Sequence, residues 1–167
     1  ASGKTTFCNV LAGYIPKNEW IITIEDPAEM QFEHPCVRRL EARPKNTEGK
    51  GEVAVRDLLM DSLRMHPDRI IVSEVRGPEA FLMINAMNTG HDGSLTTLHA
   101  NSIRDALARL VNMILMADTG LPYEAIVDQI RSALDLMVHV EQDREYRRRV
   151  VDVAEMVKNG EAGRGEF

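Results

Sequence analysis

Short hydrophobic runs without helical spacing recur along this chain and predict its strands. The run Trp20-Ile21-Ile22-Thr23-Ile24 is rich in β-branched residues, and Ile70-Ile71-Val72 has the same character. Both runs are too short for a typical helix, so we interpret them as buried strands. The complete set of predicted strands covers residues 20–24, 37–40, 70–72, 94–99, 134–140 and 148–156.

Between these runs, apolar residues recur at every third or fourth position and predict helices. Leu58, Leu59 and Leu63 mark one such helical face, which ends at His66-Pro67. Helices that alternate with strands indicate parallel βαβ units with right-handed crossovers. We therefore predict an α/β fold in which a mainly parallel central sheet is flanked by helices. The predicted helices cover residues 7–13, 55–66, 78–87 and 103–116, with another after Pro122.

The first six residues match the second half of a phosphate-binding loop. In such loops, successive backbone N–H groups surround phosphate oxygens, a lysine reaches the β- and γ-phosphates, and a hydroxyl binds Mg²⁺. The pattern predicts a nucleoside triphosphate site in which Thr5 is also a ligand of Mg²⁺. The predicted phosphate-binding residues are Ser2, Gly3, Lys4, Thr5 and Thr6.

This loop also sets the expected domain boundaries. A phosphate-binding loop follows a strand, so we expect the fold to be truncated at its N-terminus. The domain is expected to cover residues 1–157, with its first strand and the start of the loop before residue 1. Residues 158–167 are Gly-rich and charged, and we expect them to form a flexible tail.

The composition restricts the class of partner. The formal net charge is −6 and the pI is about 5.4, which disfavours a protein whose main partner is a nucleic-acid backbone. Cys8 and Cys36 are far apart in the sequence, so neither a disulfide framework nor a zinc site is indicated. No apolar run in the sequence approaches the roughly 20 residues that a membrane-spanning helix requires.

Ionisable residues follow three of the predicted strands. Glu25 and Asp26 end the strand at 20–24, Glu74 follows the strand at 70–72, and His99 ends the strand at 94–99. Each has a structural explanation of its own, as a helix cap or a packed histidine. Because ligands of parallel sheets bind beyond the carboxyl ends of the strands, the fold should bring these side chains to the rim where the phosphate loop lies.

The three strand-end residues have distinct predicted roles in catalysis. Hydrolysis of a nucleoside triphosphate requires charge neutralisation, a metal ion, a group that orients water, and a sensor of the γ-phosphate. Glu74 is predicted to hold the hydrated Mg²⁺ and to polarise the attacking water, and Glu25 is a second candidate for that water. His99 is predicted to donate a hydrogen bond to the γ-phosphate.

Longer segments of the chain resemble motifs of the type II/type IV secretion ATPase superfamily. Ile24-Glu25-Asp26-Pro27 is similar to its aspartate box, residues 72–77 to its Walker B segment, and residues 90–102 to its histidine box. Residues 40–44 and 48–52 further resemble the branch that powers tight-adherence pili and related conjugative machines. The tetracysteine insertion of many type II secretion ATPases is missing from the sequence, which favours that branch.

The resemblance implies a RecA-like C-terminal ATPase domain that uses ATP and Mg²⁺ and works as a homohexamer. It further implies a cytoplasmic position at the inner membrane, reached through a platform protein of a secretion or pilus machine. Hydrolysis would drive pilin assembly or protein export, without direct contact to nucleic acid. In one departure from the family, Ser73 stands where a glycine usually precedes the Walker B glutamate. Either the backbone there does not need a positive φ, or catalysis is altered.

Other basic residues have both a functional and a structural interpretation. Arg43, Arg64 and Arg76 are candidates for stabilising transition-state charge, within the subunit or across an interface. Alternatively, Arg64 is a favourable cation at a helix end and Arg76 holds the turn after a strand. We interpret the triplet 147–149 as a solvated strand start, and His91 as a packed or capping residue.

Other functions stay open at this level. A RecA-like nucleic-acid translocase would need a basic channel with aromatic stacking residues, and aromatic residues make up only 5% of the chain. A GTPase is disfavoured because the sequence has no Asn-Lys-x-Asp guanine-binding motif. A P-loop fragment that binds nucleotide weakly and is catalytically inactive is the remaining alternative.

Overall fold

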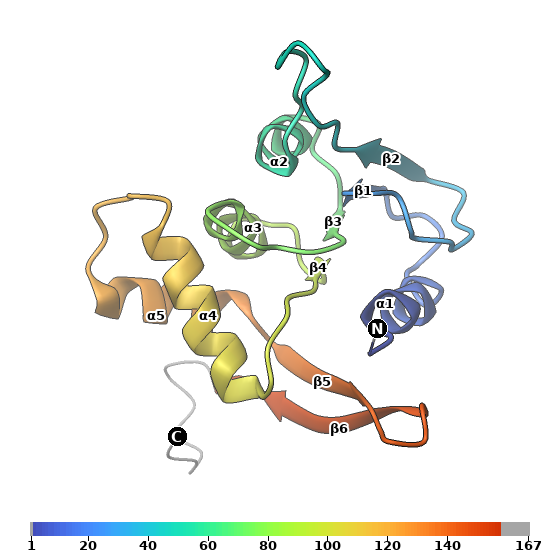
Figure 1. Ribbon diagram of the computed structural model, residues 1–167, viewed down its shortest axis with the longest axis vertical. Coiled ribbons are helices and arrows are strands. Elements are labelled where there is room, and N and C mark those ends of the chain that lie inside the picture. Colours follow the sequence, from blue (N-terminus) through green and yellow to red (C-terminus); the bar gives the residue numbers. More distant parts are fainter. Residues whose placement is uncertain (1, 158–167) are drawn as a thin grey trace.

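A computed structural model describes residues 2–157 of the chain (Figure 1). It confirms the predicted α/β fold, because helices flank a sheet of four parallel strands. The predicted tail at 158–167 lies outside the described residues. In chain order the elements are α1 (Lys4–Ala12), β1 (Ile21–Glu25), β2 (Val37–Glu41), α2 (Val55–Arg64), β3 (Arg69–Val72), α3 (Glu79–Asn88), β4 (Leu95–Thr96), α4 (Ile103–Leu115), α5 (Tyr123–Ala133), β5 (Leu136–Gln142) and β6 (Arg148–Glu155).

The strands of the parallel sheet lie in the order β2-β1-β3-β4. Ile24 of β1 pairs with Leu40 of β2 on one side and with Val72 of β3 on the other, and Val72 also pairs with Thr96 of β4. This register aligns the last residues of the four strands. The segments that follow β1, β3 and β4 therefore leave the sheet at the same edge.

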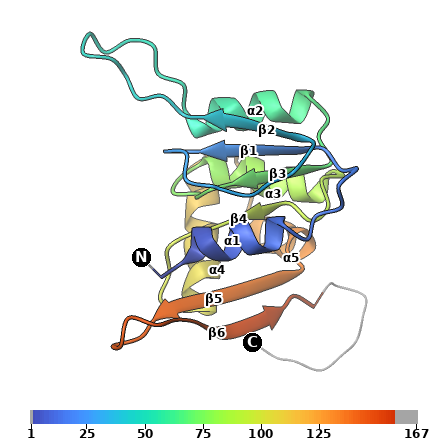
Figure 2. The same ribbon diagram turned by 90° about the vertical axis from the view of Figure 1, so that its right-hand side faces the viewer.

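The two faces of β1 pack against different helices. Ile22 and Ile24 belong to the larger hydrophobic cluster, which includes residues of α2, α3, α4 and α5. Ile21 packs with Cys8 and Ala12 of α1 in a second cluster. The alternation follows the two-residue period of a strand, so the sheet lies between α1 and the other helices (Figures 1 and 2). Burial raises the pKa of the Cys8 thiol to about 11, so this cysteine serves as a packing residue.

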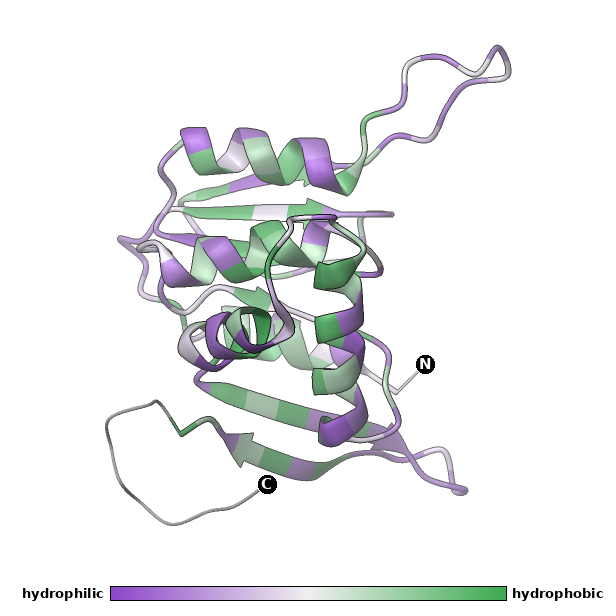
Figure 3. Ribbon diagram, turned by 90° about the vertical axis from the view of Figure 1, so that its left-hand side faces the viewer, coloured by the Kyte–Doolittle hydropathy of each residue, from purple (hydrophilic) through white to green (hydrophobic). Residues whose placement is uncertain are grey.

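The polar segment between β2 and α2 forms a loop. It projects from the body of the domain and is mostly hydrophilic (Figures 2 and 3). Its base is closed by an antiparallel bridge between Arg43 and Val53. Arg43 Nε also donates to the carbonyl of Gly51 at 2.7 Å, so this arginine stabilises the loop itself.

The last two strands form an antiparallel hairpin with a bulge between His139 and Val140. In Figure 2, β5 lies beyond β4 and runs in the same direction as the strands of the parallel sheet. A cavity of about 740 Å³ lies between β4 and β5. Residues of α1 also line it, as do residues of α3 and α4.

Strand β4 is shorter than the sequence predicts, since it covers Leu95–Thr96 and not residues 94–99. One of its edges pairs with β3, and the other faces the cavity. Beyond Thr96, the pairing on the β3 side continues to the hydrogen bond from the Val75 N–H to the Thr97 carbonyl and ends there. Within the described residues, the buried Thr96 Oγ1 also has no hydrogen-bond partner. In the part of the chain that the structure describes, β4 has a paired strand on one side, and this accounts for its short length.

Candidate active site

The start of α1 has the geometry of an anion-binding site. Gly3 adopts φ +94°, in the left-handed region, and the helix begins at Lys4. This turn directs the unpaired N–H groups of the first helical turn, and the positive end of the helix dipole, towards the strand ends. The structure distributes the predicted phosphate-binding residues over the loop and this first turn, with Ser2 lining the cavity and Thr6 exposed.

Lys4, His99 and Glu74 come together at the carboxyl edge of the sheet, as the sequence predicts. Lys4 Nζ lies 3.3 Å from His99 Nδ1, although 95 positions separate the two residues in the chain. His99 Nε2 lies 3.3 Å from Glu74 Oε1. The imidazole thus connects the lysine of the phosphate loop to the glutamate that follows β3.

This arrangement fixes the hydrogen-bonding pattern around Glu74. Lys4 carries only donors, so His99 Nδ1 accepts and Nε2 carries the proton that points to Glu74. Arg76 Nη2 donates to the other carboxylate oxygen of Glu74 at 3.1 Å. That hydrogen bond and the charge of Glu74 raise the pKa of the Arg76 guanidinium. The mostly buried carboxylate thus has a guanidinium on one side and an imidazole N–H donor on the other.

The carboxylate of Glu25 is directed to the segment that follows β1. Its side chain is buried, and Oε2 accepts from the N–H groups of Glu29 and Met30 at 2.7 Å each. Oε1 accepts from the Thr23 hydroxyl at 3.4 Å. Glu25 thus fixes the backbone of residues 29–30, and its predicted part in orienting water stays a prediction.

Glu29 is a residue of the site that the sequence reasoning missed. Its Oε2 accepts a hydrogen bond from Thr5 Oγ1 at 3.3 Å, so this carboxylate lies beside the hydroxyl predicted to bind Mg²⁺. The signal in the sequence was a second glutamate four positions after Glu25 and two positions after the end of the aspartate box. It was overlooked because the segment lies in no regular element, and only the bonds to Glu25 turn it towards α1.

The family model described as "Type II/IV secretion system protein" matches residues 1–160 of the chain. The chain belongs to this family. It is 42% identical over 153 residues to a protein of Mycobacterium tuberculosis provisionally named a conjugal transfer protein, covering 92% of this chain and 43% of that protein. It is 41% identical over 159 residues to the type IV secretion system protein PtlH of Bordetella pertussis, covering 91% of this chain and 46% of PtlH. The chain thus spans less than half the length of these relatives.

Solved structures of the secretion family share the fold. The VirB11 ATPase of the Brucella suis type IV secretion system, solved in complex with sulphate, superposes with a TM-score of 0.81 at 35% identity, over 93% of this chain and 47% of VirB11. The pilus retraction motor PilT with bound ADP gives a TM-score of 0.67 at 24% identity, over 95% of this chain and 46% of PilT. The domain therefore has the RecA-like fold of these ATPases. Each helix within residues 2–157 is too short or too polar to cross a bilayer.

The donor atoms at this edge of the secretion-family domain fit Mg²⁺. Thr5 supplies a hydroxyl oxygen, and Glu29 and Glu74 supply carboxylates. Mg²⁺ prefers such oxygen ligands and takes one or two carboxylates together with substrate phosphates and water. Within the described part of the chain, no group of three or more His, Cys, Asp or Glu side chains is arranged around a common point. A site of this composition would hold the ion together with the phosphates.

Ser73, which departs from the usual family residue, has an ordinary backbone conformation. The non-glycine residues with positive φ in the described chain are His66, Asp118 and Tyr146. The Ser73 N–H donates to Ile24 at 2.9 Å, and its carbonyl accepts from the Thr97 hydroxyl at 2.6 Å. Of the two alternatives raised by the sequence, the backbone at this position does not need a positive φ.

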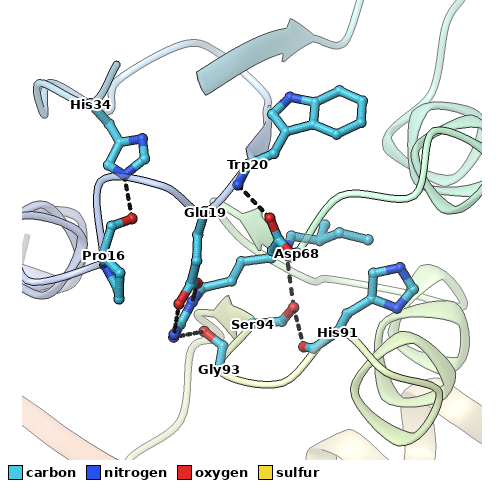
Figure 4. A network of polar contacts seen from close by, with 10 residues as sticks. Pro16, Glu19, Trp20, His34, Asp68, His91, Gly93 and Ser94 are labelled. Atoms are coloured by element: carbon cyan, nitrogen blue, oxygen red, sulfur yellow. Dashed lines mark hydrogen bonds and ion pairs between the residues drawn. The ribbon is translucent and has the colours of Figure 1, made fainter. Parts of the chain in front are cut away.

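The first part of the histidine box lies at the opposite edge of the sheet from His99. His91 is buried, with Nδ1 3.2 Å from the carbonyl of Ala86, which confirms its packing role. Gly93 accepts from Arg69 Nη1 at 3.2 Å, and a Cβ placed on Gly93 would overlap this guanidinium. Arg69 also pairs with Glu19, which lies near Gly93 in Figure 4, and this ion pair connects the entrances of β1 and β3. Residues of the histidine box therefore lie at both edges of the sheet, because β4 runs from one edge to the other.

The candidate arginines have different surroundings. Arg76 bonds to Glu74 within the site, as described above. Arg64 is the last residue of α2, where it pairs with Asp61 at 3.2 Å on the surface. This placement matches the structural interpretation of Arg64 as a cation at a helix end.

Proposed function

We propose that this domain is the ATP-hydrolysing motor of a secretion or pilus-assembly machine. The observation that carries the proposal is the contact series from Lys4 through His99 to Glu74 at the start of α1. It joins the phosphate loop, the histidine box and the Walker B segment, which are remote in the sequence. A solely structural role would not need a lysine, an imidazole and a carboxylate at one helix N-terminus.

Each residue at this edge of the sheet would have its own role in ATP hydrolysis. The loop N–H groups and Lys4 would hold the phosphates, and Thr5 with Glu74 would hold Mg²⁺, which supplies charge neutralisation on the β- and γ-phosphates. Glu74 would also accept the proton of the attacking water. His99 would move its hydrogen bond from Glu74 to the γ-phosphate, and thereby report the state of the nucleotide. Glu25 would act through the loop it holds, by directing Glu29 towards Thr5.

The setting of the motor is proposed from the relatives. PtlH and VirB11 are named as type IV secretion system proteins, which supports a place in such a machine. We assign the chain to a homohexamer at the cytoplasmic face of the inner membrane, docked on a platform protein, where hydrolysis drives pilin assembly or protein export. The net charge of −6 agrees with the absence of a direct nucleic-acid partner.

The test is the ATPase activity of the full-length protein and of two variants. Lys4→Ala removes the cation of the loop and should abolish both ATP binding and turnover. Glu74→Gln keeps the shape but not the charge, so it should retain ATP binding while turnover falls at least about a hundredfold.

A matched control is Glu124→Gln, since Glu124 is an exposed carboxylate in the first turn of α5. It should behave as wild type. Unchanged turnover in both Lys4→Ala and Glu74→Gln would show that the site is wrongly assigned. Absence of ATP binding by the unsubstituted protein would favour the alternative of an inactive P-loop domain.

A further inference from the structure

Three consecutive arginines at the hairpin of β5 and β6 differ in their partners. Arg147 pairs with Asp143 at 2.9 Å and with Glu145 at 2.6 Å. Arg149 Nη2 lies 3.2 Å from the same carboxylate of Asp143. The acidic residues of the turn thus neutralise these two arginines locally.

Arg148 has a different neighbour. It is exposed, pairs in register with Gln142 of β5, and its side chain lies against the phosphate loop. A Cβ placed on Gly3 would be 2.7 Å from Arg148 Cδ and 3.5 Å from Nε. A side chain at position 3 would have to displace the side chain of Arg148 from this place. Figure 2 shows the turn of the hairpin on the same side of the molecule as the start of α1.

Within residues 2–157, Arg148 pairs with no carboxylate. Among residues 2–157, the ion pairs of the hairpin involve Arg147 and Arg149 but not Arg148. The phosphate loop therefore has two cations close to it, Lys4 from the helix and Arg148 from β6. Two cations beside a helix N-terminus would repel each other unless an anion lies between them.

We propose that Arg148 is a second cationic ligand of the nucleotide phosphates, supplied by the same subunit. The planar guanidinium matches the geometry of phosphate oxygens, which it can bind with two parallel hydrogen bonds. Its aliphatic stem covers Gly3, so the head group is held near the loop at a small entropic cost. The inference rests on the proposed nucleotide site and adds to it a residue from the far end of the chain.

The experiment separates a charge role from a packing role. Arg148→Met keeps an aliphatic stem that covers Gly3 but removes the charge. Arg148→Lys keeps the charge but lacks the planar guanidinium. The dissociation constant of ATP, measured by calorimetry on the full-length protein, should rise about tenfold in Arg148→Met and less in Arg148→Lys. Arg149→Met is the matched control, because that arginine is adjacent and paired to Asp143.

The outcomes are distinct. Wild-type affinity in Arg148→Met, or an equal loss in Arg149→Met, would overturn the inference. Lys4→Ala is measured in parallel: if it loses ATP binding while Arg148→Met does not, the nucleotide site stands and only the role of Arg148 fails. If Lys4→Ala binds ATP as the wild type does, the proposed function itself fails. Thermal unfolding of each variant checks that the fold is intact.

Discussion

Two glutamates four residues apart, Glu25 and Glu29, show how the site depends on single side chains. Glu25 is buried and accepts two short hydrogen bonds from backbone N–H groups, one of them from Glu29. Glu29 is exposed and meets the Thr5 hydroxyl. One carboxylate thus shapes the segment, and the other presents an oxygen to the phosphate loop.

This difference predicts different effects for the same substitution. Glu25→Gln replaces charge-assisted hydrogen bonds with weaker ones and should destabilise the fold by about 1–3 kcal/mol. Glu29→Gln should leave the stability unchanged and weaken the dependence of nucleotide binding on Mg²⁺. Urea unfolding and ATP titrations at several Mg²⁺ concentrations measure the two effects. A stable Glu25→Gln variant would mean that the buried bonds contribute little.

At the scale of elements, the ion pair between Glu19 and Arg69 joins the entrances of β1 and β3. Arg69 also donates to Gly93, ahead of β4. The three strands are therefore tied together at one edge, while the other edge carries the site. The hydrogen bond from Arg69 lowers the pKa of Glu19 below its usual value near 4.5 and raises the pKa of Arg69.

The lowered pKa of Glu19 predicts a pH-dependent contribution to stability. Since the folded-state pKa lies below the unfolded value, the contribution is complete above about pH 4.5 and is lost as the pH falls through the folded-state pKa. The difference in melting temperature between wild type and Glu19→Gln should therefore shrink on acidification from pH 7 to pH 3. Glu33→Gln, which changes an exposed carboxylate, should show no such trend. A difference that stays constant with pH would rule out this linkage.

At the scale of the whole molecule, a cavity separates β4 from β5. Strand edges form two of its walls, and helices α1, α3 and α4 form the others. Strand edges carry backbone groups that need partners, and Thr96 Oγ1 is buried there without one in the described chain. A parallel strand placed in this cavity would offer hydrogen-bond partners to both edges.

We expect a strand at this position to stabilise the domain. Extension of the chain ahead of residue 1 by about five or six alternately apolar residues and the remainder of the loop should raise the melting temperature. Amide exchange should slow at residues 96–98 and 138–140, as backbone hydrogen bonds form on both sides. An extension of equal length made of Gly and Ser is the control. Equal exchange in the two extended proteins would exclude the pairing.

Most of the fold could be predicted because its signals are local. The hydrophobic runs of β1 and β3 and the helical spacing of Leu58, Leu59 and Leu63 are readable from neighbouring residues. The length of β4 could not be predicted, because it depends on a neighbour on each side. The phosphate loop and Glu74 were predicted from short patterns, whereas Glu29 and Arg148 lie outside such patterns and reach the loop only through tertiary contacts.

The sequence by itself determined the α/β class, the order of the elements and the chemical types placed at the strand ends, because these follow from local spacing and from the parallel direction of the strands. The tertiary structure alone decided which side chains meet. His99 links Lys4 to Glu74, Glu25 is directed to its own loop, and His91 lies at the far edge. The physical reason is that register and side-chain direction are set by packing across the sheet, which no stretch of neighbouring residues encodes.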